Sequence, residues 1–349
     1  MLKDRKWTQS IIIAVFVMAI LGGCGSSDEY IRSGMQAIKE LDYQTAVSCF
    51  EQARAAGEDE RLICRGMGIA YMGMTEYAQA SACFEEALRL SKGLPEEMDY
   101  DLNYYLAAAY AKQNKLEDAE QTYNAILTMR SNEADVYFLR GNVRLGLDKI
   151  EEATADFQKV VEIEPENYDR YIQIFEMLNF YGQKETGKLF LQEALSRDNS
   201  KITAYDKGRI FYYLEEYQQA YLALEEARSM GSADAYLYLG KAYEATGDYN
   251  YASSVYNSFL AKDTSHAEIY NQLGLCEMAK GEYEKALAAF QSGMKAANNN
   301  IQQTLAFNEI VAYEYLGEFD KASVLMKTYL QNYPDDKKAQ REAEFLSTR

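Results

Sequence analysis

Histidine is almost absent from this chain, which limits the chemistry that the chain can perform. The single histidine, His266, lies in a connection ahead of a helical segment. No catalytic triad, histidine metal pair or phosphate loop can be built around it. Adjacent glutamates such as Glu151-Glu152 do not face each other on a helix and make poor acid–base pairs. The sequence therefore predicts no catalytic residue, no metal site and no cofactor, and gives no basis for an enzyme.

Cysteine is also scarce, with five residues among 349. Cys49, Cys64, Cys83 and Cys276 lack the C-x-x-C or cysteine–histidine spacing of a metal site. Cys49 and Cys83 each follow a recurring small residue by three positions, which favours packing in a helical core. A disulfide such as Cys49–Cys64 is the alternative in an oxidising compartment. Spacing alone leaves open whether Cys49, Cys64 and Cys83 form disulfides.

Basic residues are outnumbered by acidic ones, 36 to 54, and the formal net charge is −18. Nucleic acid and anionic lipid headgroups repel such a chain, so neither is expected as a partner. We interpret the acidic balance as a well-solvated surface. No polybasic patch is present to support membrane attachment.

An uninterrupted hydrophobic run, Ile11–Leu21, follows three basic residues near the start of the chain. Its eleven residues are too few for a transmembrane helix, which needs about 20, but they fit the apolar region of a secretory signal. Small residues and Cys24 follow, in the segment Leu21-Gly22-Gly23-Cys24. This arrangement resembles the bacterial lipoprotein signal, in which the cysteine receives a diacylglycerol and becomes the new N-terminus.

The lipoprotein resemblance implies a signal peptide at residues 1–23, a lipid on Cys24 and a short tether at 24–27. The mature chain would then be lipid-anchored to a bacterial cell membrane on its extracytoplasmic face. The alternative is an uncleaved membrane anchor with an incidental cysteine. Both interpretations place most of the chain outside the cytoplasmic membrane.

A small residue recurs nine times at intervals of 32–39 residues, most of them close to 34. The positions are Ala46, Ala80, Ala119, Ala153, Gly187, Ala220, Ala252, Ala286 and Ala322. Such a period is typical of a solenoid, in which each short repeat needs its neighbours to bury its apolar face.

Other positions repeat in step with these residues. A glycine precedes several of them, at Gly34, Gly68, Gly141, Gly208, Gly240 and Gly274. A phenylalanine follows four residues later, at Phe50, Phe84, Phe157 and Phe290. Turn glycines, which supply the positive φ that ends a helix, stand at Gly182, Gly247, Gly281 and Gly317.

This pattern resembles the tetratricopeptide repeat, L-G-x₂-Y…A-x₃-F…P. The resemblance implies an all-α solenoid of about nine helix-turn-helix repeats over residues 28–334, with a capping helix at 335–349. The fifth repeat is degenerate, because Phe175 and Gly187 stand where glycine and alanine are expected. The segment Ser91–Pro95 lengthens one connection, as a surface loop or as a local change of pitch.

In this family the first helix of each repeat lines the concave face, where ligands usually lie. The resemblance therefore implies a set of candidate binding residues, namely Tyr104, Phe138, Asn142, Tyr205, Arg209, Tyr212 and Lys241. Aromatic, amide and basic side chains suit an extended peptide. The alternative is that each residue packs against the next repeat. The aspartates near the helix starts, Asp101, Asp135 and Asp169 among them, are expected to favour the helix dipole.

The preferred function is a membrane-anchored extracytoplasmic scaffold that holds a protein partner or an envelope assembly through its concave surface. The alternative is a receptor lipoprotein that binds peptides or glycans. The sequence does not identify the partner, the envelope type or the oligomeric state.

Overall fold

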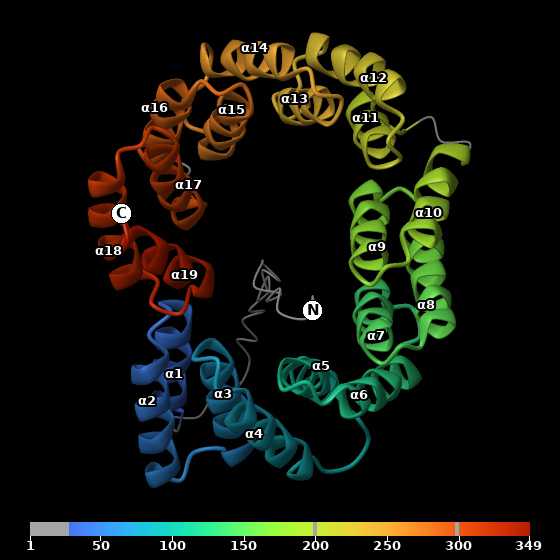
Figure 1. Cartoon of the computed structure of the whole chain (residues 1–349). Helices are drawn as coiled ribbons and strands as arrows, with labels where there is room; N and C mark the ends of the chain where they lie inside the picture. The colour runs from blue at the N-terminus through green and yellow to red at the C-terminus, as the bar shows by residue number, and fades with distance from the viewer. Residues whose placement is uncertain (1–27, 198–200, 297–299) are drawn as a thin grey trace. The chain divides into compact units, whose positions relative to one another are not determined.

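The fold is all-α across the residues that the computed structural model describes, 28–197, 201–296 and 300–349 (Figure 1). Nineteen helices and no strand occur in these ranges. The helices are α1 (Glu29–Lys39), α2 (Tyr43–Ala56), α3 (Glu60–Gly73), α4 (Tyr77–Arg89), α5 (Glu97–Lys112), α6 (Leu116–Met129), α7 (Ala134–Gly146), α8 (Ile150–Ile163), α9 (Tyr168–Phe180), α10 (Lys184–Ser196), α11 (Ala204–Tyr213), α12 (Tyr217–Ser229), α13 (Ala235–Ala245), α14 (Tyr249–Leu260), α15 (Ala267–Ala279), α16 (Tyr283–Met294), α17 (Gln302–Tyr315), α18 (Phe319–Asn332) and α19 (Lys337–Leu346).

The first eighteen helices form nine consecutive pairs, one pair for each recurring small residue. The predicted all-α solenoid of paired helices is confirmed. The chain divides into two compact units, each with its own hydrophobic core. The first unit ends at Ser131 and contains α1–α6, and the second begins at Asn132 and contains α7–α19.

A single left-handed residue closes the turn inside every pair. Four of these nine residues are the predicted glycines, with φ of 74–80°. The other five turns use the residues Leu41, Thr75, Asn114, Asp148 and Glu215, with φ of 60–66°. Because a side chain disfavours this conformation, the repeated geometry shows that packing of the two helices, and not only glycine, determines the turn.

The conserved spacing between glycine and the following aromatic residue has a direct packing reason. A Cβ at Gly240 would lie 2.2 Å from the ring of Tyr256, and a Cβ at Gly274 would lie 2.3 Å from the ring of Phe290. Each ring belongs to the second helix of the same repeat. An aromatic ring therefore approaches the backbone closely at these two glycines.

The degenerate fifth repeat has a phenylalanine at the usual glycine position and a glycine at the usual alanine position. Phe175 occupies the usual glycine position on α9 and is 5 % exposed. Gly187 occupies the usual alanine position on α10, and a Cβ there would lie 3.1 Å from the Phe175 ring and 3.2 Å from its Cα. The missing methyl group of the second helix makes room for the added ring of the first. The repeat is thus complete in packing although its sequence departs from the pattern.

The connection between α4 and α5 is exposed, and Leu94 within it is 88 % exposed. The C-terminal helix α19 buries Ala339 and Leu346 against α17 and α18. No helix among the described residues is both long and apolar enough to cross a membrane. Cys24 and the hydrophobic run lie outside the described residues.

Candidate functional site

The candidate binding residues come from the first helices of four repeats. Tyr104 is half-buried on α5, in the first unit. The others belong to the second unit: Phe138 and Asn142 on α7, three residues on α11, and Lys241 on α13. The structure brings the α11 and α13 residues together, so these form the strongest candidate surface.

Four half-buried tyrosines lie together on α11 and α13, and we call Tyr205, Tyr212, Tyr213 and Tyr238 the tyrosine cluster. Tyr238 is at its centre. Its ring centroid is 6.0 Å from that of Tyr205, 5.7 Å from that of Tyr212 and 6.1 Å from that of Tyr213. The rings meet edge to face, a favourable geometry for aromatic pairs. The cluster therefore presents aromatic edges and faces from two consecutive repeats.

Tyr213 and Tyr238 are not among the candidate residues predicted from the sequence. Each lies one residue away from a position that the repeat resemblance assigns to the concave face. Their rings nevertheless reach the cluster. The aromatic content of the segment Phe211-Tyr212-Tyr213 and of Tyr236-Leu237-Tyr238 was the available signal.

The hydroxyl groups of Tyr205, Tyr212 and Tyr213 remain protonated at neutral pH. Burial raises the pKa of Tyr205 and of Tyr212 above the usual value. Burial and the neighbouring Tyr238 raise the pKa of Tyr213, whose hydroxyl donates a hydrogen bond to Glu176 Oε1 on α9 at 2.7 Å. The cluster thus offers neutral phenol groups that can donate and accept hydrogen bonds.

Lys241 supplies a positive charge beside the cluster. Its Nζ lies 5.2 Å from the centroid of the Tyr238 ring, within the range of a cation–π contact. No carboxylate of the described residues forms an ion pair with this ammonium group. Glu244 of the same helix interacts with this charge electrostatically without forming an ion pair. The ammonium group can therefore still bind a ligand that approaches the tyrosine rings.

Arg209, by contrast, is already engaged within the chain. Its guanidinium lies 2.6 Å from Asp169 of α9 and 2.6 Å from Asp206 of its own helix, and it stacks over Tyr205 at 4.6 Å. The side chain is 11 % exposed. Nε is buried and has no hydrogen-bond partner among the described atoms. Arg209 thus joins α9 to α11, and its largely buried guanidinium packs against the Tyr205 ring.

Phe138 and Asn142 lie apart from the tyrosine cluster, on α7. The Arg170 guanidinium stacks over the Phe138 ring at 4.8 Å, and Phe157 lies 5.8 Å away on the other helix of the repeat. Asn142 Oδ1 is buried and has no hydrogen-bond partner in the described part of the chain. Phe138 is therefore largely a packing residue, whereas Asn142 retains an unused acceptor.

Three of the recurring aspartates form ion pairs with the neighbouring repeat, a role that the sequence analysis did not predict. Asp101 accepts from Arg65 Nε at 2.5 Å in the first unit. In the second unit, Asp169 pairs with Arg209, as described above, and Asp135 pairs with Arg170. Asp135 and Asp169 do lie in the first turn of their helices. The spacing of 34 residues between these aspartates is the feature of the sequence from which the ion pairs between repeats could have been predicted.

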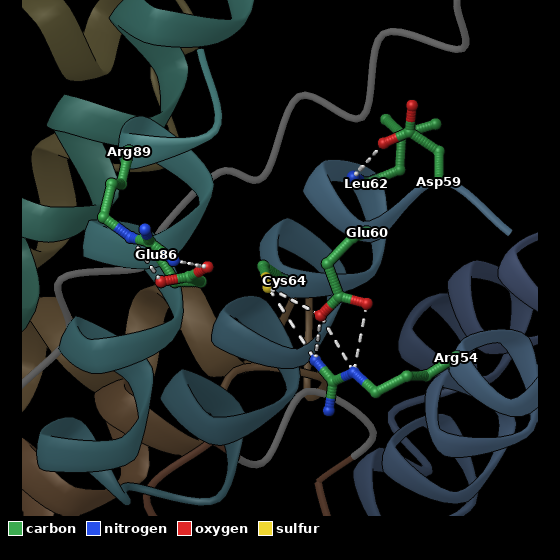
Figure 2. A network of polar contacts seen from close by, with 7 residues as sticks. All are labelled: Arg54, Asp59, Glu60, Leu62, Cys64, Glu86 and Arg89. Carbon is green, nitrogen blue, oxygen red and sulfur yellow. Dashed lines mark hydrogen bonds and ion pairs between the residues drawn. The ribbon is translucent and has the colours of Figure 1, made fainter. Parts of the chain in front are cut away.

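A polar network in the first unit links α2 to α3 (Figure 2). Arg54 Nε donates to Glu60 Oε1 at 2.8 Å, and the Cys64 thiol donates to the same oxygen at 3.4 Å. Burial, together with this hydrogen bond, raises the pKa of Cys64 to about 12. The thiol therefore stays neutral and is a poor nucleophile. The described cysteines Cys49, Cys64, Cys83 and Cys276 are all free.

Models of one protein family match the chain. One tetratricopeptide repeat model matches residues 65–136, 205–252 and 245–301, and a second matches residues 134–167. Together these matches cover more than half of the sequence. The chain belongs to the tetratricopeptide repeat family. Its members generally act as non-catalytic scaffolds that bind protein partners.

Individual tetratricopeptide relatives are distant. RNA polymerase II-associated protein 3 of Homo sapiens is 23% identical over 195 residues, which cover 52% of this chain and 29% of that protein. Tetratricopeptide repeat protein 8 of Homo sapiens is 29% identical over 104 residues, 30% of this chain and 19% of that protein. The chain thus spans less than a third of the length of either relative. The crystal structure of a tetratricopeptide repeat protein from Parabacteroides merdae aligns with a TM-score of 0.47 and 14% identity, covering 72% of this chain and 98% of that one.

Proposed function

We propose that this chain is a scaffold that holds an extended segment of a partner protein against the tyrosine cluster and Lys241. The observation that carries the proposal is the ammonium group of Lys241, which forms no ion pair with the described residues, beside four clustered tyrosines. Aromatic rings bind side chains with little loss of conformational entropy, and phenol hydroxyls can bond to a peptide backbone. The membership of a scaffold family supports a protein partner.

We further propose that the scaffold works outside the cytoplasmic membrane, held there by a lipid on Cys24. The support is the order of basic residues, apolar run and cysteine at the start of the chain. Because the net charge is −18, anionic lipid headgroups repel the chain. The acyl chains would therefore supply the attachment.

The binding surface can be tested by placing a photo-crosslinking amino acid at Tyr212 in intact cells and identifying the crosslinked protein. The same partner, purified, is then titrated against the wild-type chain and the variant Lys241→Glu. We expect roughly tenfold weaker binding, because a central charge contact is reversed. Crosslinking from Tyr315 is the matched control, since this tyrosine is 61 % exposed and belongs to another repeat. Equal affinity of Lys241→Glu would contradict the proposed surface.

A receptor for peptides or glycans is the second candidate, favoured by the neutral phenol hydroxyls of the half-buried tyrosines. It predicts a rise in Tm when short peptides or oligosaccharides are added to the purified chain, lost in Lys241→Glu or Tyr238→Phe. A rise with these ligands and no crosslinked protein would favour the receptor over the scaffold.

A further inference from the structure

Three tyrosines on consecutive helices stack on one another outside the tyrosine cluster, and we call Tyr221, Tyr243 and Tyr251 the tyrosine stack. They belong to α12, α13 and α14. The rings of Tyr221 and Tyr243 are nearly parallel, with centroids 4.3 Å apart and an angle of 11°. The centroid of the Tyr251 ring is 4.5 Å from that of Tyr243, at an angle of 39°. Because Tyr221 and Tyr251 make no ring contact with each other in the described part of the chain, Tyr243 is the middle ring.

The outer ring of the stack, Tyr251, is open to solvent. Tyr243 occupies one side of this ring, and Tyr251 is nevertheless 52 % exposed. The other two tyrosines are half-buried, and the hydroxyl of Tyr221 is hydrogen-bonded to Thr246 Oγ1 at 2.7 Å. The stack is therefore anchored at its inner end and presents one ring face at the surface.

Asp248 adds a carboxylate next to this ring. It is the residue before α14, and its Oδ1 accepts a hydrogen bond from the backbone N–H of Tyr251 at 3.1 Å. Asp248 is exposed and forms no ion pair with any described residue. A carboxylate and an exposed ring, three residues apart, thus share the start of one helix.

The same arrangement in the first unit holds an arginine. Glu97 is the first residue of α5, and Tyr100 follows it by three positions. Arg130 forms an ion pair with Glu97 and stacks over the Tyr100 ring at 4.0 Å. One guanidinium therefore satisfies the carboxylate and covers the ring.

A second example lies in the second unit. Asp135 is in the first turn of α7, and Phe138 again follows by three positions. Arg170 forms an ion pair with Asp135 and stacks over the Phe138 ring at 4.8 Å. In this chain, a carboxylate and a ring at this spacing bind arginine twice, in two different repeats.

The chain supplies no such cation to the tyrosine stack. Arg228, on α12, lies over the Tyr236 ring at 5.7 Å, and Lys241, on α13, lies over the Tyr238 ring. The helix α14 contains no lysine or arginine. Among the described residues, no cation lies over the rings of the stack or pairs with Asp248.

We propose that Tyr251 and Asp248 bind an arginine side chain of a partner protein. The guanidinium lies on the open face of the Tyr251 ring and donates N–H bonds to the Asp248 carboxylate, as Arg130 and Arg170 do within the chain. The net charge of −18 attracts a cationic ligand. Lysine binds less well, because its compact ammonium is more strongly hydrated and cannot stack as a plane. The site shares no residue with the tyrosine cluster and does not rest on the proposed function.

Fluorine NMR of the full chain with 3-fluorotyrosine placed only at Tyr251 tests the site. The probe is the peptide acetyl-Gly-Arg-Gly-amide, compared with the same peptide carrying lysine or the neutral citrulline in place of arginine. We expect a saturable change of the fluorine chemical shift with the arginine peptide. The lysine peptide should bind about threefold more weakly, and the citrulline peptide should produce no saturable change.

Two variants and a second label serve as controls. Asp248→Asn should weaken binding of the arginine peptide about threefold, because it removes the charge while asparagine still caps the helix. Asp320→Asn makes the same change at an exposed position in the first turn of α18 and should have no effect. Tyr315, labelled instead of Tyr251, is 61 % exposed and lies against Tyr283 at 5.0 Å, but Ala312 precedes it by three positions. Its signal should show no saturable change.

Four results would overturn the site. Absence of a saturable change at residue 251 would show that the ring does not bind arginine. Equal affinities for the arginine and lysine peptides would indicate only a general attraction of cations to an acidic chain. An equal response at residue 315, or an unchanged affinity in Asp248→Asn, would show that the carboxylate does not contribute.

Discussion

At the scale of single residues, pairs of positions share the space between the two helices of a repeat. A ring on the second helix requires a glycine opposite it on the first, as for Gly240 and Tyr256. In the fifth repeat, Phe175 stands at the glycine position of the first helix, and Gly187 at the alanine position of the second helix lies against it. Each residue is therefore constrained by one identified partner.

This pairing predicts a strong coupling between Phe175 and Gly187. In Gly187→Ala, the added methyl group would press on the Phe175 ring and backbone, at a cost of about 1–3 kcal/mol of unfolding free energy. In a Phe175→Ala background the same change should cost less, because the ring is gone and only the contact with the backbone of residue 175 remains. Thermal or urea unfolding of the two single variants and the double variant measures the coupling. Simple additivity of the two effects would show that the residues do not share this space.

At the scale of helices, the sequence was sufficient to predict the helix pair of each repeat but not the side-chain contacts between repeats. The 34-residue period predicted the helix pairs and their turns because small residues, rings and turn residues act within one repeat. The pairs Asp169–Arg209 and Asp135–Arg170 join different repeats at separations of 40 and 35 residues. Such pairs depend on how far a flexible arginine reaches. For the same reason Tyr238, whose ring reaches past the expected positions, became visible only in the structure.

The ion pairs between first helices predict unequal effects of two substitutions. Asp169→Asn should cost less than about 1 kcal/mol, because Asp169 is exposed and Asp206 still neutralises Arg209. Arg209→Met should cost more, since it leaves Asp206 without its ion-pair partner and removes the support of the Tyr205 ring. Unfolding curves of both variants test this order. A larger loss in Asp169→Asn would show that the contact to α9 dominates.

At the scale of the whole molecule, the proposed membrane attachment of a chain with net charge −18 would depend on the lipid on Cys24. The proposed binding surface lies on α11 and α13 of the second unit, whereas the proposed tether lies ahead of α1. Loss of the tether should therefore change where the chain is found without changing its folding or its binding surface.

The variant Cys24→Ala tests the tether. Without the thiol no thioether to diacylglycerol can form, so we expect complete loss of lipid labelling and accumulation of a precursor that retains residues 1–23. Metabolic labelling with an alkyne fatty acid and the mass of the protein from membranes measure both outcomes. Cys49→Ala is the control, because this half-buried cysteine lies on α2 and should leave labelling intact. Labelling that persists in Cys24→Ala, or is lost only in Cys49→Ala, would show that the lipid is not attached to Cys24. The alternative, an uncleaved hydrophobic anchor, would then be favoured.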